Sequence, residues 1–387
     1  MEPIELLDII AKGESSTVQF KERLPHPDSL AQEMVAFSNT EGGIIIVGVN
    51  DKTGELKGLS FDEIRTTNQH LVEVATQKVF HSINIKTETV TANGQQIIVV
   101  YIKEGKSKPY KDRNGIVFVK NGSDKRRVVS NDELLRMLQS SGNIAADEEP
   151  VENTTYNNLS ADFFKMFVEK KTGKKFNDLN QSIPQILNNM SLAKDEKLTL
   201  AGLLLFGKKP QNFKPIFSVQ CIAFVGNDVA VKEFRDNEPP FDGNLTELYE
   251  KTISFISRNL HRKQVEKSFN TVGELEIPKE VFEELVVNAL IHRDYFIQSS
   301  IKVFIFDNRI EIISPGTLPN TLTVEKIKSG TSIVRNAILF SNARYLLPYT
   351  GVGHGIPAAL NAYPRIDFVD ETDKELFTAI IQRVAPA

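Results

Sequence analysis

Two polar residues one helical turn apart stand in the segment 283–295, which reads EELVVNALIHRDY. Glu284 and Asn288 share one face of the predicted helix, because residues four positions apart are neighbours on a helix surface. An asparagine oxygen can hold a Mg²⁺ ion that also binds phosphates, and a glutamate one turn earlier can polarise a water molecule for attack. The pair therefore indicates metal-assisted phosphate chemistry, with a solvated helix face as the alternative.

Glycines follow this helix at two places. Gly316 comes directly after a predicted hairpin, and Gly351, Gly353 and Gly355 alternate before a predicted helix. Alternating glycines at a helix start expose backbone N–H groups, which can cradle phosphate. Such a run is weak evidence alone, but it is stronger in this order after the glutamate and asparagine. The chain has no Walker A motif, so P-loop helicase activity is not expected.

A second group of residues with chemical potential lies near the N-terminus. Glu14, Lys21 and Asp51 flank the apolar run 43–49, where Gly42 and Gly43 allow a tight turn into a buried strand. Two carboxylates and a lysine at one sheet edge suit divalent-metal-assisted phosphodiester chemistry. Without a metal ion, the lysine alone suits phosphate contact. Helix or turn capping by the two acids is the alternative.

The most basic stretch of the chain is the window 103–127, which also contains Tyr110 and Phe118. Basic side chains interleaved with aromatics are the groups that phosphate contact and base stacking require. A solvated charged face is the alternative interpretation. The residues expected to contact nucleic acid are Lys108, Lys111, Lys120, Lys125, Arg126 and Arg127.

The periodicity places these groups on helices and strands in both halves, which predicts an α+β fold. Expected elements include a helix over 278–291 and a hairpin formed by 301–306 and 309–313. Residues 140–158 are small, polar and acidic, which is typical of a linker. The predicted parts are therefore a domain over 1–140, a linker over 141–158, a connecting subdomain over 159–230 and a domain over 231–387.

The overall charge of the 387-residue chain is slightly acidic, because 46 Lys and Arg oppose 50 Asp and Glu. This balance excludes a protein that coats nucleic acid through bulk charge but permits a local basic face. The single cysteine, Cys221, lies in an apolar stretch and is expected to be a buried side chain. The N-terminus lacks the order of a signal peptide and no apolar run is long enough to span a bilayer, so a cytoplasmic location is expected.

Residues 10–140 resemble the Schlafen-type AlbA domain. The resemblance is carried by Glu14-Ser15, Phe20-Lys21, the segment 37–43 (FSNTEGG) and the segments 108–110 (KPY) and 117–123 (VFVKNGS). It implies nucleic-acid binding. In nuclease members three acidic residues carry RNA cleavage, and the resemblance places the first on Glu14 and the third on Asp51. The second falls on Gln19, whose amide is a poor metal ligand and cannot act as a base.

Residues 195–383 resemble the GHKL ATPases, most closely the divergent "RecG-like C-terminal" or "divergent AAA" group. The resemblance is carried by 203–208 (LLLFGK), the Glu284 helix, Arg335-Asn336 and the late glycines. It implies an α/β sandwich that binds ATP with Mg²⁺. Glu284 would be the ATPase base, Asn288 the Mg²⁺ ligand, and Gly316, Gly351, Gly353 and Gly355 the nucleotide-binding glycines. The aspartate that reads adenine has no counterpart, since Ser314 stands at its position.

Three functional hypotheses follow from these observations. The first is a nucleotide-modulated nucleic-acid-binding regulator of transcription or defence, with weak ATPase activity at most. The second is a metal-dependent RNase or DNase that uses Glu14, Asp51 and Lys21, which Gln19 disfavours. The third is an oligomeric assembly protein in which both sites are relics. We expect a homo-oligomer with no membrane partner, and the residues do not distinguish DNA from RNA.

Overall fold

The computed structural model divides the chain into two compact units, Met1–Ile144 and Ala145–Ala387. It describes residues 1–141, 144–230, 233–263, 273–319, 322–348 and 353–383. Both units combine helices with sheets, which confirms the predicted α+β class. Within these ranges, the structure contains no helix with the length and apolar character needed to cross a bilayer.

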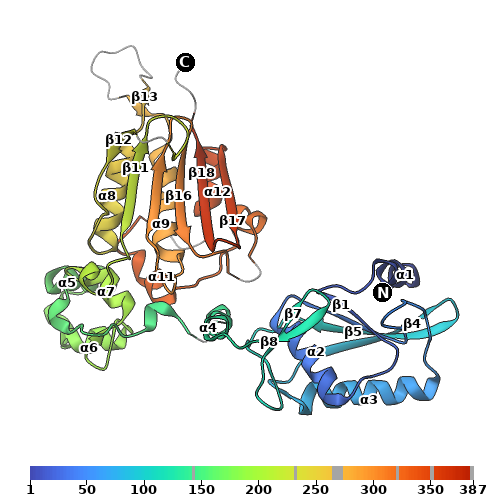
Figure 1. Cartoon of the computed structure of the whole chain (residues 1–387). Helices are drawn as coiled ribbons and strands as arrows, with labels where there is room; N and C mark the ends of the chain where they lie inside the picture. Colours follow the sequence, from blue (N-terminus) through green and yellow to red (C-terminus); the bar gives the residue numbers. More distant parts are fainter. Residues whose placement is uncertain (142–143, 231–232, 264–272, 320–321, 349–352, 384–387) are drawn as a thin grey trace. The chain divides into compact units, whose positions relative to one another are not determined.

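The N-terminal unit is built on a four-stranded sheet with the strand order β1-β2-β5-β4 (Figure 1). β1 runs parallel to β2, and the β2–β5 and β5–β4 pairs are antiparallel. Two-residue and four-residue strands form the additional pairs β3–β6 and β7–β8. The elements are α1 (Pro3–Lys12), β1 (Val18–Lys21), α2 (Pro27–Asn39), β2 (Gly42–Val47), α3 (Phe61–Gln77), β3 (Val79–Phe80), β4 (Ile85–Ala92), β5 (Gln95–Lys103), β6 (Lys111–Asp112), β7 (Phe118–Asn121), β8 (Asp124–Arg127) and α4 (Asn131–Ser140).

The apolar run of β2 is buried on both faces of this sheet, as its continuous hydrophobic sequence predicts. Ile45 and Val47 belong to the cluster that α2 and α3 cover, while Ile46 packs with Leu6 of α1 on the opposite face. A side chain at Gly43 would collide with the carbonyl of Thr17 and the ring of Phe37. Glycine is therefore required where the chain passes from α2 into β2.

The C-terminal unit contains a six-stranded sheet with the order β12-β11-β15-β16-β18-β17, in which only the β11–β15 pair is parallel. Helices α8, α9 and α12 lie on one face of this sheet (Figure 1). The helices are α5 (Ala161–Thr172), α6 (Ile183–Asn189), α7 (Leu200–Phe206), α8 (Leu245–Arg258), α9 (Lys279–His292), α10 (Val324–Lys328), α11 (Ala337–Ala343) and α12 (Gly355–Ala362). The strands are β9 (Ala193–Lys194), β10 (Lys197–Leu198), β11 (Val219–Phe224), β12 (Phe234–Asn237), β13 (Arg262–Lys263), β14 (Glu274–Leu275), β15 (Ile301–Ile305), β16 (Arg309–Pro315), β17 (Ile366–Glu371) and β18 (Leu376–Gln382).

The predicted hairpin is the antiparallel pair β15–β16, with Ile305 opposite Ile310. Cys221 of β11 is 1% exposed, so the expectation of a buried cysteine is confirmed, and burial raises the pKa of its thiol. β11 pairs with β15, so the predicted boundary between residues 230 and 231 falls inside one sheet. A boundary based on composition misses such pairing because the partner strand lies some 80 residues further along the chain.

The predicted linker is wrong from Ala145 onward, because this stretch belongs to the C-terminal unit. Asp147 is completely buried, and its Oδ2 accepts hydrogen bonds from the backbone N–H groups of Ile338 and Leu339 at 2.7 and 2.9 Å. Those two N–H groups lie in the first turn of α11 and lack acceptors within the helix. A polar, acidic stretch is therefore ordered here by capping a helix almost two hundred residues away.

Candidate functional site

A cavity of about 120 Å³ in the C-terminal unit brings together the residues that the sequence singled out. Glu284 and Asn288 of α9 line it together with Gly316, Gly353 and Gly355. These residues come from one helix, the turn after β16 and the start of α12, and the first and last of them, Glu284 and Gly355, are 71 positions apart in the chain. Gly351 was also predicted to bind nucleotide, and it lies outside the described residues.

The predicted glutamate and asparagine contact each other inside this cavity. The side-chain amide of Asn288 donates from Nδ2 to Glu284 Oε1 at 2.8 Å, which leaves the amide oxygen available as a metal ligand. Burial raises the pKa of Glu284, and the hydrogen bond from Asn288 partly opposes this rise. A carboxyl group with a raised pKa is better suited to exchange a proton near neutral pH than an ordinary glutamate.

The glycines allow backbone segments to approach closely at this end of the cavity. A side chain at Gly355 would collide with the Glu284 carboxylate, and one at Gly353 would lie 2.5 Å from the carbonyl oxygen of Gly330. Gly353 and Gly330 have φ angles of 75° and 90°, which only glycine adopts without strain. Because the first N–H groups of α12 lack acceptors within the helix, this end of the cavity suits an anion such as phosphate.

The floor of the cavity is an apolar surface of the sheet. Ile312 of β16 is paired with Ala379 of β18, which in turn is paired with Phe368 of β17, and all three line the cavity. Leu285 and Ile356 from the two helices complete the walls. A planar apolar group such as a nucleobase fits this environment, because ligand pockets are mostly apolar with a few polar groups for orientation.

The opposite end of the cavity carries an arginine that was not among the predicted site residues. Arg335 donates from Nη2 to the carbonyl of Thr317 at 2.8 Å, and its Nη1 lies 4.0 Å from Asp294 Oδ2. Burial lowers the pKa of its guanidinium group. A Cβ atom at Gly316 would lie 2.6 Å from Arg335 Nη1, so a larger residue at position 316 would collide with the guanidinium group. The sequence signal was Arg335-Asn336, which we matched to a family element without assigning it a role.

Asn336 and His292 define the position of this arginine relative to α9. Asn336 is completely buried and donates from Nδ2 to the carbonyls of Ile291 and Arg293 at 2.8 and 2.9 Å, at the end of α9. Burial, assisted by the charge of Arg335, lowers the pKa of His292 to about 4, so His292 is neutral at pH 7. Eight residues separate His292 from Glu284, which corresponds to about 12 Å along the helix. The cavity therefore has two polar ends with an apolar floor between them.

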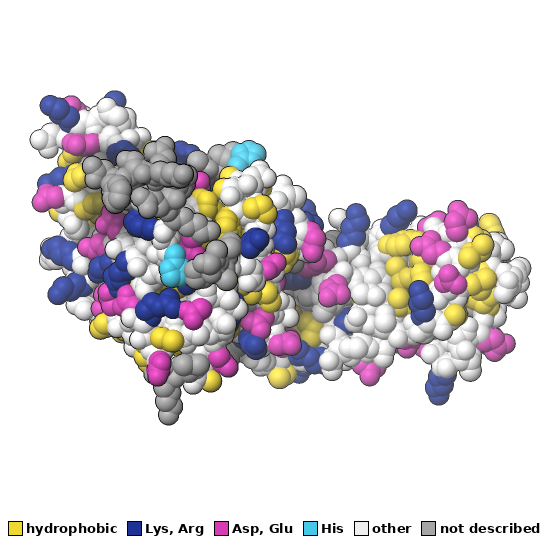
Figure 2. Space-filling view, turned by 90° about the horizontal axis from the view of Figure 1, so that it is seen from above, with side chains coloured by type: hydrophobic (Ala, Val, Ile, Leu, Met, Phe, Trp, Pro, Cys, Tyr) yellow, Lys and Arg dark blue, Asp and Glu magenta, His cyan; other side chains and the backbone are white. Residues whose placement is uncertain are grey.

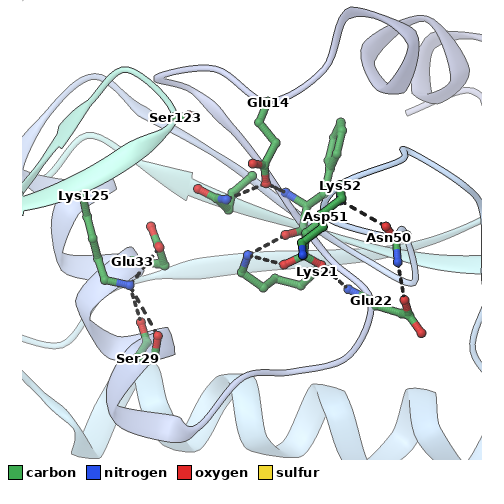
Figure 3. Close-up of polar contacts among 12 residues, drawn as sticks. Glu14, Lys21, Glu22, Ser29, Glu33, Asn50, Asp51, Lys52, Ser123 and Lys125 are labelled. Carbon is green, nitrogen blue, oxygen red and sulfur yellow. Dashed lines mark hydrogen bonds and ion pairs between the residues drawn. The ribbon is translucent and has the colours of Figure 1, made fainter.

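The N-terminal acidic residues and lysine are shown in Figure 3. Lys21 Nζ forms an ion pair with Asp51 Oδ2 at 2.8 Å, so these two predicted residues do meet. Glu14 does not share this ion pair. Its Oε1 accepts a hydrogen bond from the backbone N–H of Phe20 in β1 at 2.7 Å. No group of three or more His, Cys, Asp and Glu that could hold a metal ion is present among the described residues.

Gln19 occupies the position where the nuclease resemblance expects an acid. It is 7% exposed, its Nε2 donates to Glu14 Oε1 at 2.5 Å, and its Oε1 accepts from Lys120 Nζ at 2.8 Å. The amide thus satisfies a carboxylate on one side and an ammonium group on the other. Because a second carboxylate is missing, this arrangement gives a divalent cation few ligands.

Two of the lysines predicted to contact nucleic acid are buried. The Lys120 side chain is 1% exposed and pairs with Glu33 at 3.5 Å, and Lys108 is buried and pairs with Glu104 at 2.6 Å. Both lysines compensate internal acids, and their contact with nucleic acid stays a prediction.

The other four predicted basic residues differ in how far they are committed to partners. Lys125 pairs with Glu33 and Arg126 with Glu133, at 2.9 and 2.7 Å respectively. Lys111 and Arg127 are exposed. On the face drawn in Figure 2, basic and acidic side chains are interspersed, without one large basic surface.

Three family models match successive segments of the chain. Residues 14–129 match the family described as "Schlafen, AlbA_2", and residues 298–375 match "Putative ATP-dependent DNA helicase recG C-terminal". The chain therefore joins a Schlafen AlbA_2 domain to a RecG C-terminal-type domain. Residues 135–218 between them match a domain of unknown function (DUF8451). The two named domain types indicate a nucleic-acid-associated function.

Two solved structures match this chain at low sequence identity. The DIP2311 protein from Corynebacterium diphtheriae has 19% sequence identity and a TM-score of 0.47, with 99% of this chain and 80% of that chain covered. The N-terminal domain of a putative ATP-dependent DNA helicase RecG-related protein from Nitrosomonas europaea has 21% identity and a TM-score of 0.26, with 34% and 96% covered. No curated protein matches the chain.

Proposed function

We propose that this chain is a nucleic-acid-binding regulator whose C-terminal cavity binds ATP with Mg²⁺. The observation that carries the proposal is that Glu284, Asn288 and the glycines of α12 line one cavity above an apolar floor. The phosphates would lie at the glycine end, where backbone N–H groups favour anions. The base would lie on the floor formed by Ile312, Phe368 and Ala379.

The donor set at the glycine end suits a Mg²⁺ ion that arrives with the phosphates. Mg²⁺ usually binds one or two protein oxygens and completes its coordination with phosphates and water. Asn288 Oδ1 would supply the protein ligand, because its Nδ2 is committed to Glu284. The ion would neutralise phosphate charge, and Glu284 would hold or accept the proton of an attacking water molecule. This arrangement favours nucleotide binding with slow turnover.

Arg335 and Ser314 would meet the base edge at the other end of the cavity. Ser314 donates to the carbonyl of Ala289 at 3.4 Å, so its oxygen retains lone pairs for a base amino group. The guanidinium group of Arg335 offers further donors, whereas a carboxylate is absent from the described lining at this end. We therefore expect weaker preference for adenine than a carboxylate would give.

Calorimetric titration of the full chain with ATP and Mg²⁺ tests this proposal. Asn288→Ala removes the expected Mg²⁺ ligand and the hydrogen bond to Glu284, so we expect affinity to fall by about a hundredfold, since partners of bound charge contribute about 1.5–3 kcal/mol each. Asn189→Ala changes an exposed asparagine of α6 in the same unit and serves as the matched control. Equal affinities in wild type and Asn288→Ala would rule out nucleotide binding through this residue.

The N-terminal unit would contact nucleic acid through its exposed lysine and arginine side chains. Nucleotide binding to the C-terminal unit would change the strength of that contact. The match to the Schlafen AlbA_2 family over residues 14–129 supports this assignment. An experiment that follows binding of labelled DNA and RNA with and without ATP and Mg²⁺ tests the coupling. A nucleotide that binds tightly but leaves nucleic-acid affinity unchanged would contradict the regulatory part of the proposal.

A further inference from the structure

A second cavity, of about 280 Å³, lies in the N-terminal unit away from Glu14 and Asp51. Pro109, Val117 and the α4 side chains Leu134 and Leu138 form its apolar walls. His81, Ser107 and Lys111 are exposed residues that also line it. Apolar walls with a few polar residues at the rim suit a planar group such as a nucleobase.

An exposed aromatic ring stands beside the polar side of this cavity. Phe80 is 54% exposed, and in the β3–β6 pair it lies directly opposite Lys111. Side chains directly opposite each other in an antiparallel pair project from the same face, about 5 Å apart. Their neighbours Val79 and Asp112 are buried, so Phe80 and Lys111 both project to solvent. An aromatic ring and a cation at this distance are the two groups that hold a base and its phosphate.

The charge around the cavity is positive, in contrast to the acidic chain as a whole. The segment 103–113 carries five basic residues and two acidic ones. Both acids are internally committed, since Glu104 pairs with Lys108 and buried Asp112 accepts from the backbone N–H groups of Asn114 and Ile116. Lys106, Lys111 and Arg113 are exposed. The local field therefore favours a polyanion.

We infer that this cavity captures an unpaired base of a single-stranded nucleic acid, with a neighbouring base stacked on Phe80 and a phosphate beside Lys111. The inference rests on the proposed nucleic-acid-binding function and specifies the form of the ligand. A duplex keeps its bases stacked and paired, so it cannot insert one between Pro109 and α4 without paying for unstacking. DNA and RNA strands share the recognised chemistry.

Fluorescence anisotropy with the full chain tests the inference, using labelled 16-residue oligo-dT, oligo-rU and a duplex of the same length. Phe80→Ala is expected to weaken binding of both single strands about tenfold or more, because stacking on one aromatic contributes that much. Phe61→Ala is the matched control, since Phe61 is 78% exposed at the opposite end of α3, about 25 Å away along the helix axis. Phe80→Tyr should retain wild-type affinity.

Two further variants separate stacking from insertion and phosphate contact. Ser107→Trp places a large side chain at the exposed rim of the cavity and should weaken single strands as strongly as Phe80→Ala. Lys111→Gln should lower the slope of log affinity against log salt by about 0.7, the value for one phosphate of a single strand. All these positions are exposed, so the variants retain the core.

The outcomes distinguish the inference from the proposed function. Binding of oligo-dT, oligo-rU or both that is lost in Phe80→Ala and kept in Phe61→Ala supports it, and the ratio of the two identifies the preferred strand. Wild-type binding with equal affinity for duplex and single strands, or equal losses in Phe80→Ala and Phe61→Ala, overturns the inference and leaves nucleic-acid binding intact. A wild-type chain that binds none of the three ligands overturns both.

Discussion

Gln19→Glu is expected to destabilise the N-terminal unit by about 3 kcal/mol at pH 8, the typical scale for an uncompensated buried charge. The introduced carboxylate would face Glu14 across the present 2.5 Å contact, at a site that is 7% exposed. Lys120 can neutralise only one of the two charges, because it also pairs with Glu33. We therefore expect the variant to hold one proton between the two carboxyl groups.

The sign of the pH dependence follows from that shared proton. The folded variant retains a proton that the unfolded chain releases, so stability is present at low pH and is lost as the pH rises. A divalent cation can take the place of the proton, since carboxylate oxygens are good ligands for it. Millimolar Mn²⁺ should therefore restore most of the lost stability at pH 8.

Scanning calorimetry of wild type, Gln19→Glu and Gln19→Met at pH 5 and pH 8, with and without Mn²⁺, measures this effect. Gln19→Met removes the same hydrogen bonds without adding charge, so its loss should depend on neither pH nor Mn²⁺. A Gln19→Glu variant that behaves like Gln19→Met would show that Glu14 and Gln19 are not coupled. Cleavage of RNA by the Mn²⁺-loaded variant, with none by wild type, would show that Gln19 alone blocks nuclease activity.

Acidification is expected to destabilise the C-terminal unit through His292. Its pKa is about 4 in the folded protein, against an ordinary value of 6.5, because the ring is buried and close to Arg335. The unfolded chain therefore binds a proton before the folded chain does, and stability falls as the pH drops from about 6.5 to 4. The total expected loss is about 3 kcal/mol, from 1.4 kcal/mol for each unit of pKa.

Urea unfolding of wild type and His292→Gln between pH 7 and pH 4 isolates this contribution. The glutamine cannot be charged, so the difference in unfolding free energy between the two proteins should shrink or reverse as the pH falls. Glu284 has a raised pKa and contributes stability of the opposite sign, present at low pH and lost as the pH rises. It is common to both proteins and cancels in the difference. Parallel pH profiles would contradict the assignment.

Local patterns in the sequence predict the fold class and five of the residues that line the cavity, namely Glu284, Asn288, Gly316, Gly353 and Gly355. The spacing of Glu284 and Asn288 places them on one helical face, and the glycines mark the backbone turns that meet them. The hairpin that becomes β15 and β16 follows from alternating apolar residues around Asp307 and Asn308. Each of these features depends on residues that are close together in the sequence. Composition and periodicity are therefore sufficient to predict them.

Local sequence patterns do not predict contacts between segments that are far apart in the chain. The sequence alone predicts that Lys120 is an exposed basic residue. Its burial depends on contacts with Gln19 and Glu33, which lie about 90 to 100 positions earlier in the chain. Asp147 looks like part of a linker because its two donors, Ile338 and Leu339, come from the far end of the chain. Arg335 was missed for the same reason, since its carbonyl acceptor belongs to Thr317 in another loop.

The buried Cys221 has a practical consequence for spectroscopy on this protein. It is the only thiol in the chain, it is 1% exposed, and burial suppresses its ionisation. Maleimide reagents attack exposed thiolates, so the native chain should remain unlabelled without any prior mutation. If one cysteine were introduced into each unit, for example at Lys111 and Met166, only these two cysteines would react with a donor and an acceptor dye. Energy transfer between the dyes would report directly on how ATP changes the distance between the units.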